Sequence, residues 1–179
     1  MSPRLQITAL FILAFLGGGA FLGYHLSQST VTWNRVDTTI AESFPDLPTI
    51  TVEGLDAWLS DEQREPPLIL DAREPEEFEL SHIPGAQWLG SGREALDRMQ
   101  DIAPGTQIVV YSAVGLRAAP VVRDLHTAGF DARHLTRGIF AWANADLPVI
   151  DAHGNNVPGV HRWNATMQRL LESEYRLRP

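Results

Sequence analysis

The chain has 179 residues, of which 44% are hydrophobic and 20% are charged, so it can form one ordinary domain with additional segments at its ends. Its net charge of -8 excludes nucleic acid as the main partner, because binding a phosphate backbone requires a basic face. The absence of cysteine excludes disulfides, thiolate metal sites and a thiol nucleophile.

The N-terminal segment is strongly hydrophobic. Residues 5–26 contain no charged residue and are long enough to span the hydrocarbon core of a bilayer. Arg4 precedes this stretch and Arg35 is the next cation, so the positive-inside rule places the amino terminus in the cytoplasm. We therefore expect residues 1–26 to form one transmembrane helix of a bacterial inner-membrane protein, with the soluble part in the periplasm. A cleaved signal peptide is the alternative, since residues 18–20 are small.

The rest of the chain divides into a linker and a domain. Residues 27–48 are polar and end near two prolines, which is typical of a linker. Residues 49–150 predict strands alternating with helices, which favours a parallel sheet covered on both faces. The acidic cluster at 71–79 is interpreted as a solvated turn and helix start. We expect strands within 68–71, 86–89, 108–111 and 131–135, and helices within 51–59, 91–99, 117–129 and 138–148.

Residues 151–179 form a C-terminal extension beyond this domain. Its apolar residues Trp163, Met167, Leu170 and Leu171 are spaced as i, i+4, i+7 and i+8. This spacing places them on one face of an α-helix. We therefore predict an amphipathic helix that docks on the domain or on a neighbouring protein.

The segment that carries the chemistry is the loop between the strand at 108–111 and the helix after it. Such a loop points several backbone N–H groups at one spot, where the helix N-terminus adds partial positive charge. Gly115 allows the turn to close, and Arg117 can bind an oxyanion with two hydrogen bonds. A plain strand-to-helix connection is the alternative. The predicted anion-binding loop consists of Ser112, Ala113, Val114, Gly115, Leu116 and Arg117.

Three motifs of this domain resemble those of the rhodanese domain family. They are LILDAREPEEFELSHIPGAQWL at 68–89, IVVYSAVGLRAA at 108–119 and LTRGIFAWANADLPV at 135–149. The resemblance covers residues 49–150. It implies an α/β fold with a central parallel sheet flanked by helices. It also implies an active-site loop of the form Cys-x4-Arg, which carries a persulfide during sulfur transfer.

The loop departs from the family pattern at its first position. By position, Ser112 stands where the family has its cysteine, and Arg117 stands where it has its arginine. The resemblance further implies that Asp71 and Arg73 support the active site. Sulfur transfer needs a thiolate, whereas a serine hydroxyl is far less acidic and cannot form a persulfide. We therefore expect a member of a sulfurtransferase family that lacks this activity.

The sequence leaves three functions open. The first is a module that binds a small sulfur-containing anion, or a periplasmic partner protein, through the loop. The second is a thiosulfate-type sulfurtransferase whose cysteine has been replaced by serine. The third is an accessory structural subunit of an integral-membrane complex. No cofactor is expected, and no metal site, since His153 and His161 have no third ligand beside them in the sequence.

Overall fold

The computed structural model describes residues 30–89, 102–103 and 105–177. The expected transmembrane helix and the expected helix at 91–99 lie outside these residues. Among the described residues, no helix is both long and apolar enough to cross a membrane. The described elements belong to one compact unit, Thr32–Pro179.

A parallel five-stranded sheet forms the centre of this unit. The sequence predicts the parallel sheet and four of its strands, but not the short edge strand at 49–50. The strands pair in the order β1-β5-β4-β2-β3, and every pair is parallel. The central strand β4 is buried from its second residue to its last, because helices cover both faces of the sheet. The strands are β1 (Thr49–Ile50), β2 (Leu68–Asp71), β3 (Gln87–Trp88), β4 (Gln107–Tyr111) and β5 (Asp131–Leu135).

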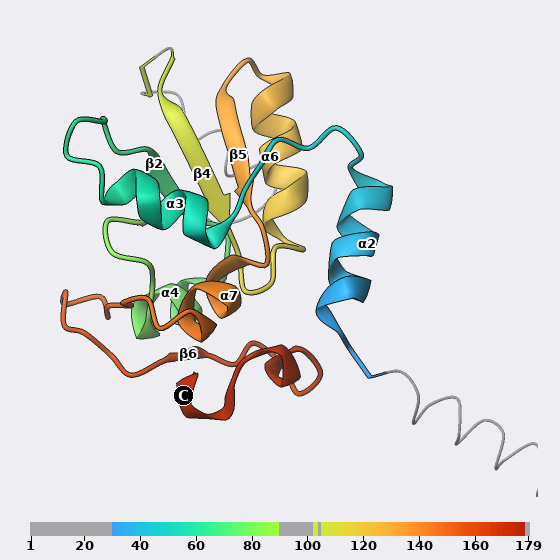
Figure 1. Ribbon diagram of the computed structural model, residues 1–179, viewed down its shortest axis with the longest axis vertical. Coiled ribbons are helices and arrows are strands. Elements are labelled where there is room, and N and C mark those ends of the chain that lie inside the picture. Colours follow the sequence, from blue (N-terminus) through green and yellow to red (C-terminus); the bar gives the residue numbers. More distant parts are fainter. Residues whose placement is uncertain (1–29, 90–101, 104, 178–179) are drawn as a thin grey trace, which may run out of the picture. The chain divides into compact units, whose positions relative to one another are not determined.

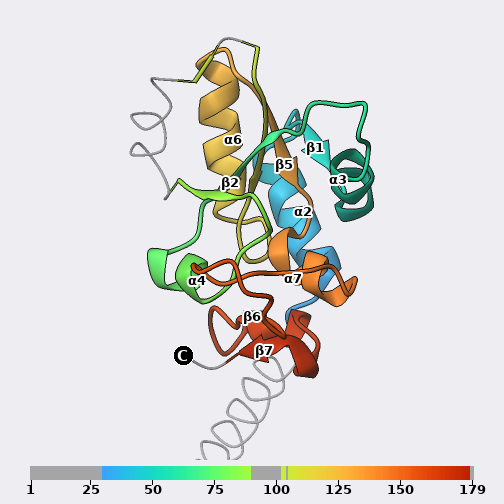
Figure 2. The same cartoon turned by 90° about the vertical axis from the view of Figure 1, so that its left-hand side faces the viewer.

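Helices lie on both sides of the sheet. In Figure 2, α6 (Ala118–Thr127) lies on one side, and α3 (Val52–Leu59) and α7 (Gly138–Asn144) lie on the other. The core between the sheet and α6 contains buried aliphatic side chains of β2, β4 and α6. The hydroxyl of Thr51 caps α3 by accepting a hydrogen bond from the backbone N–H of Gly54 at 3.1 Å. Helix α4 (Pro75–Leu80) follows β2.

The segment interpreted as a linker contains a helix in its described part. This helix, α2, covers Trp33–Ser43, and Thr32 caps it. The side chain of Asp37 in this helix forms an ion pair with Arg137 at 2.7 Å, so α2 is attached to the domain. The sequence prediction missed this helix because its polar residues favoured a linker, although Trp33, Val36 and Ile40 are spaced as i, i+3 and i+7.

The predicted C-terminal α-helix is wrong. The extension instead forms two short 3-10 helices, Met167–Leu170 and Ser173–Tyr175, and a parallel pair of strands, β6 (Val160–His161) and β7 (Arg176–Leu177). Trp163 has a φ of 57°, which a helix cannot include.

The extension docks on the domain, one of the two placements predicted for it. Asn144 of α7 donates a hydrogen bond to the carbonyl of Leu170 at 2.9 Å and accepts one from the N–H of Glu172 at 3.0 Å. Leu170 and Leu171 are buried. Figure 1 shows β6 running beside α4 and α7.

Replacing Gly138 tests how tightly α7 approaches the loop after β4. Gly138 has a φ of +56°, and a Cβ there would lie 2.0 Å from the carbonyl oxygen of Ser112. We expect Gly138→Ala to lower the free energy of unfolding by about 3 kcal/mol or more, from overpacking added to left-handed strain. The matched control is Gly129→Ala, where φ is +92° and no atom lies within 4 Å. It should cost about 1–2 kcal/mol of strain alone in urea unfolding. Equal losses of unfolding free energy in the two variants would contradict a close contact between Gly138 and the Ser112 carbonyl.

Candidate anion-binding loop

The loop Ser112–Arg117 connects the carboxyl end of the central strand β4 to the N-terminus of α6. Ser112 is 1% exposed, and Ala113 and Val114 are fully buried. The hydroxyl oxygen of Ser112 accepts a hydrogen bond from the backbone N–H of Gly115 at 3.1 Å. Gly115 has a φ of +96°, which closes the loop on itself.

Two carbonyl groups of the loop are bound to the N-terminus of α7. The carbonyl of Ser112 accepts from the N–H of Ile139, and that of Ala113 accepts from the N–H of Phe140, each at 3.0 Å. In a trans peptide the N–H points opposite to the C=O of the same unit. The N–H groups of Ala113 and Val114 therefore point away from α7.

A third carbonyl of the loop, that of Gly115, is bound by His134 of β5 and by the start of α6. The carbonyl of Gly115 accepts from His134 Nε2 at 3.0 Å and from the N–H groups of Ala118 and Ala119 at 3.1 Å. His134 is 1% exposed. Burial lowers the pKa of His134, and its hydrogen bond to Gly115 partly opposes this shift. The imidazole is therefore neutral near pH 7 and donates from Nε2.

Four backbone N–H groups of the loop have no partner in the described part of the chain. They belong to Ala113, Val114, Leu116 and Arg117. Buried N–H groups are almost always hydrogen-bonded, because an unpaired one costs desolvation free energy. A cluster of such donors at the start of a helix is the arrangement that binds anions in proteins.

The guanidinium of Arg117 is directed at the acidic residues near the start of α4. It donates to both carboxylate oxygens of Glu77 on α4, at 2.6 and 3.0 Å, and lies 3.6 Å from the carboxylate of Glu74. Burial raises the pKa of Glu77, but the hydrogen bonds and charge of Arg117 outweigh it and the net shift is downward. The sequence prediction missed Glu77, which is 3% exposed although the acidic cluster was interpreted as solvated.

Asp71 and Arg73 form a buried ion pair at the carboxyl end of β2. Arg73 donates from its NH2 group to Asp71 at 2.5 Å, and from the same group to the carbonyl of Ser81 at 2.6 Å. The carbonyl of Arg73 accepts from the indole of Trp88 at 2.8 Å. Burial lowers the pKa of Arg73, but the charge of Asp71 outweighs it and the net shift is upward. The pair thus joins the end of β2 to β3 and to the segment after α4.

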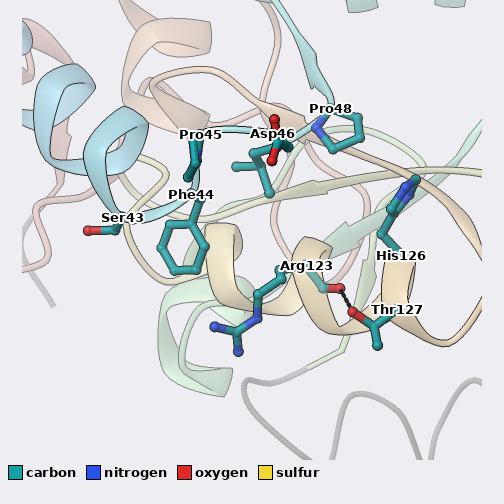
Figure 3. A pocket seen from close by; sticks show the side chains of 9 residues that line it. Ser43, Phe44, Pro45, Asp46, Pro48, Arg123, His126 and Thr127 are labelled. Atoms are coloured by element: carbon teal, nitrogen blue, oxygen red, sulfur yellow. Dashed lines mark hydrogen bonds between the residues drawn. The ribbon is translucent and has the colours of Figure 1, made fainter.

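One pocket of the described residues is separate from this loop. It has a volume of about 240 Å³ and lies between the α2–β1 connection and α6 (Figure 3). Its lining residues on α6, Arg123, His126 and Thr127, belong to the C-terminal half of that helix, whereas the loop enters the N-terminal end. Within the described residues, no group of three or more His, Cys, Asp or Glu side chains could hold a metal ion.

Comparison with known proteins identifies the family. Residues 52–145 match the Rhodanese-like domain, and the chain belongs to this sulfurtransferase-related family. It is 39% identical over 106 residues to the probable adenylyltransferase/sulfurtransferase MoeZ of Mycobacterium tuberculosis (strain ATCC 25618 / H37Rv), a match that covers 56% of this chain and 26% of that protein. This chain therefore spans about a quarter of the length of that curated relative.

Solved structures show the same fold. The solution structure of the rhodanese-like domain of the Alr3790 protein from Anabaena sp. has a TM-score of 0.54 and 27% identity, covering 66% of this chain and 90% of that one. The crystal structure of a rhodanese-like domain protein from Staphylococcus aureus has a TM-score of 0.50 and 28% identity, covering 54% and 91%. The predicted α/β fold with a central parallel sheet is thus confirmed.

Breaking the buried ion pair tests its structural role. Asp71→Asn leaves the guanidinium of Arg73 buried without a counter-charge, which costs about 3–5 kcal/mol of unfolding free energy. The control is Asp124→Asn, which breaks a pair between side chains that are 57% (Arg123) and 34% (Asp124) exposed, and which should cost less than about 1 kcal/mol. Urea unfolding measures both losses. A similar small loss in both variants would show that the buried pair does not hold these loops.

Proposed function

We propose that this protein is a rhodanese-like module without sulfurtransferase activity that binds a small sulfur-containing anion at the loop Ser112–Arg117. The single observation that carries this proposal is a set of backbone N–H groups without a partner among the described residues, in a loop that begins with serine and is buried at 112–115. These donors fit the oxygen atoms of an oxyanion and need no side-chain chemistry.

The lack of transferase activity follows from the chemistry of the first loop residue. A persulfide requires a thiol, and the chain contains no cysteine. The hydroxyl of Ser112 is buried and accepts a hydrogen bond, and no histidine in the described residues hydrogen-bonds to it. Serine catalysis needs such a base. Ser112 therefore serves the shape of the loop, and the module binds without transferring sulfur.

The class of ligand follows from the donors and from the family. Four N–H groups and the N-terminus of a ten-residue helix provide partial positive charge without a cation of their own. Such a site suits a small oxyanion such as thiosulfate or sulfite. The similarity to MoeZ, a probable adenylyltransferase/sulfurtransferase, supports a sulfur-containing ligand for this loop as well.

The proposal places the module at a membrane. Residues 5–26 are uncharged and long enough to anchor it as a single-pass protein in a bacterial inner membrane, with the domain in the periplasm. An anchored binding module can present its anion to an integral-membrane or periplasmic protein.

Ser112→Cys tests whether the missing sulfur is what silences the site. We expect the unchanged chain to show no sulfur transfer from thiosulfate to cyanide, and Ser112→Cys to show measurable turnover, because the helix N-terminus and the loop N–H groups favour a thiolate there. The assay compares both with Ser60→Cys, which places a thiol at an exposed position after α3.

Each outcome of this assay has a distinct meaning. Activity restricted to Ser112→Cys supports a loop that still binds the donor anion. The same result is expected if the protein descends from an active enzyme whose cysteine was replaced by serine. Activity of the unchanged chain would contradict the proposal, and equal activity of Ser60→Cys would show that the loop plays no part.

A further inference from the structure

Arg117 is held by two segments that lie outside the loop. Glu77 of α4 binds both of its terminal nitrogens, and the ring of Trp163 in the C-terminal extension lies 4.8 Å from the guanidinium carbon. This distance and placement are those of a cation–π contact. The arginine that could complete the anion site is thus bound to a carboxylate and covered by an indole ring.

The turn that carries Trp163 lies next to the same carboxylate. The N–H of Trp163 donates to His161 Nδ1 at 3.2 Å, and this nitrogen lies 3.7 Å from a carboxylate oxygen of Glu77. Because Nδ1 accepts a hydrogen bond from Trp163, it does not donate one to Glu77. His161 belongs to β6, which runs beside α4 and α7 in Figures 1 and 2.

We propose that the C-terminal extension is a gate on the anion-binding loop. In the closed state seen here, Trp163 keeps Arg117 on Glu77. In the open state the turn around Trp163 moves away, and Arg117 leaves Glu77 to bind the anion held by the loop N–H groups. This inference rests on the proposed function, since it concerns the regulation of the same site.

The exchange of partners is electrostatically balanced. Arg117 trades one bidentate acceptor, the Glu77 carboxylate, for another, the oxygens of the bound anion. Glu77 does not lose all compensation when Arg117 leaves, because the charge of Arg73 also lowers its pKa. In this proposal the contact between Trp163 and Arg117 favours the closed state over the open one. A substitution of Trp163 removes this contact without changing any charge.

The experiment is a calorimetric titration of the full-length chain in detergent with sodium thiosulfate at constant ionic strength. We expect Trp163→Ala to bind thiosulfate about three- to tenfold more tightly than the unchanged chain, the size of one partly exposed cation–π contact. The matched control is Trp33→Ala, which removes the ring near Arg137 at a similar distance, 5.5 Å. It should leave the affinity unchanged.

The pattern of affinities separates the gate from the proposed function. Loss of the gain in the double variant Trp163→Ala/Arg117→Ala supports the gate, because the released arginine then provides the added affinity. Equal affinity of the unchanged chain and Trp163→Ala overturns the gate and leaves anion binding intact. No binding by any variant overturns the proposed function and the gate together.

A second readout does not depend on the anion. In the Ser112→Cys background we expect Trp163→Ala to accelerate alkylation of the introduced thiol by iodoacetamide, whereas Trp33→Ala should not. Unchanged alkylation by Trp163→Ala would overturn the gate even if anion binding is observed. If Trp163→Ala lowers the midpoint of thermal unfolding, Trp163→Phe replaces it, and it should give a smaller change in the same direction.

Discussion

The hydrogen bonds between the N-terminus of α7 and the loop after β4 determine the geometry of the whole site. Two consecutive carbonyls of the loop, those of Ser112 and Ala113, bind the N–H groups of Ile139 and Phe140. Peptide planarity then directs the next two N–H groups of the loop to the opposite side. Gly138 makes this approach possible, since any Cβ there would collide with the Ser112 carbonyl. The proposed anion site is therefore a property of the backbone and does not depend on the side chain of residue 112.

Two ion pairs that differ in burial lie near this backbone. The pair of Asp71 and Arg73 is fully buried and holds the ends of β2 and β3, so it acts on the scaffold. The pair of Glu77 and Arg117 is partly exposed, because the arginine side chain is 18% accessible. This second pair lies at the border between the loop and the C-terminal extension, where Trp163 contacts Arg117.

The sequence was sufficient to predict the sheet, because hydrophobic runs and turn residues are local signals. The strand at 68–71 and the helix within 51–59 were predicted in this way. The resemblance to the rhodanese family predicted the fold, and the structure confirms it.

The errors arose where tertiary contacts outweigh local pattern. The spacing of apolar residues in the tail predicted an α-helix, but the left-handed conformation of Trp163 and the pairing of β6 with β7 exclude one. Glu77 carries no sequence signal of burial, since its partner Arg117 lies forty residues away. His134 could have been predicted to point inward, because it alternates with Ala132 along β5.

The central claim is that the loop N–H groups bind an anion in a chain without cysteine. The most direct measurement is a titration of the isotope-labelled full-length protein with sodium thiosulfate, followed by the backbone amide resonances in two-dimensional NMR. The account predicts saturable shifts of the amides of Ala113, Val114 and Leu116, while those of Thr127 and Gly129 at the far end of α6 stay in place. Unshifted loop amides at saturating thiosulfate, or equal shifts at both ends of α6, would contradict it.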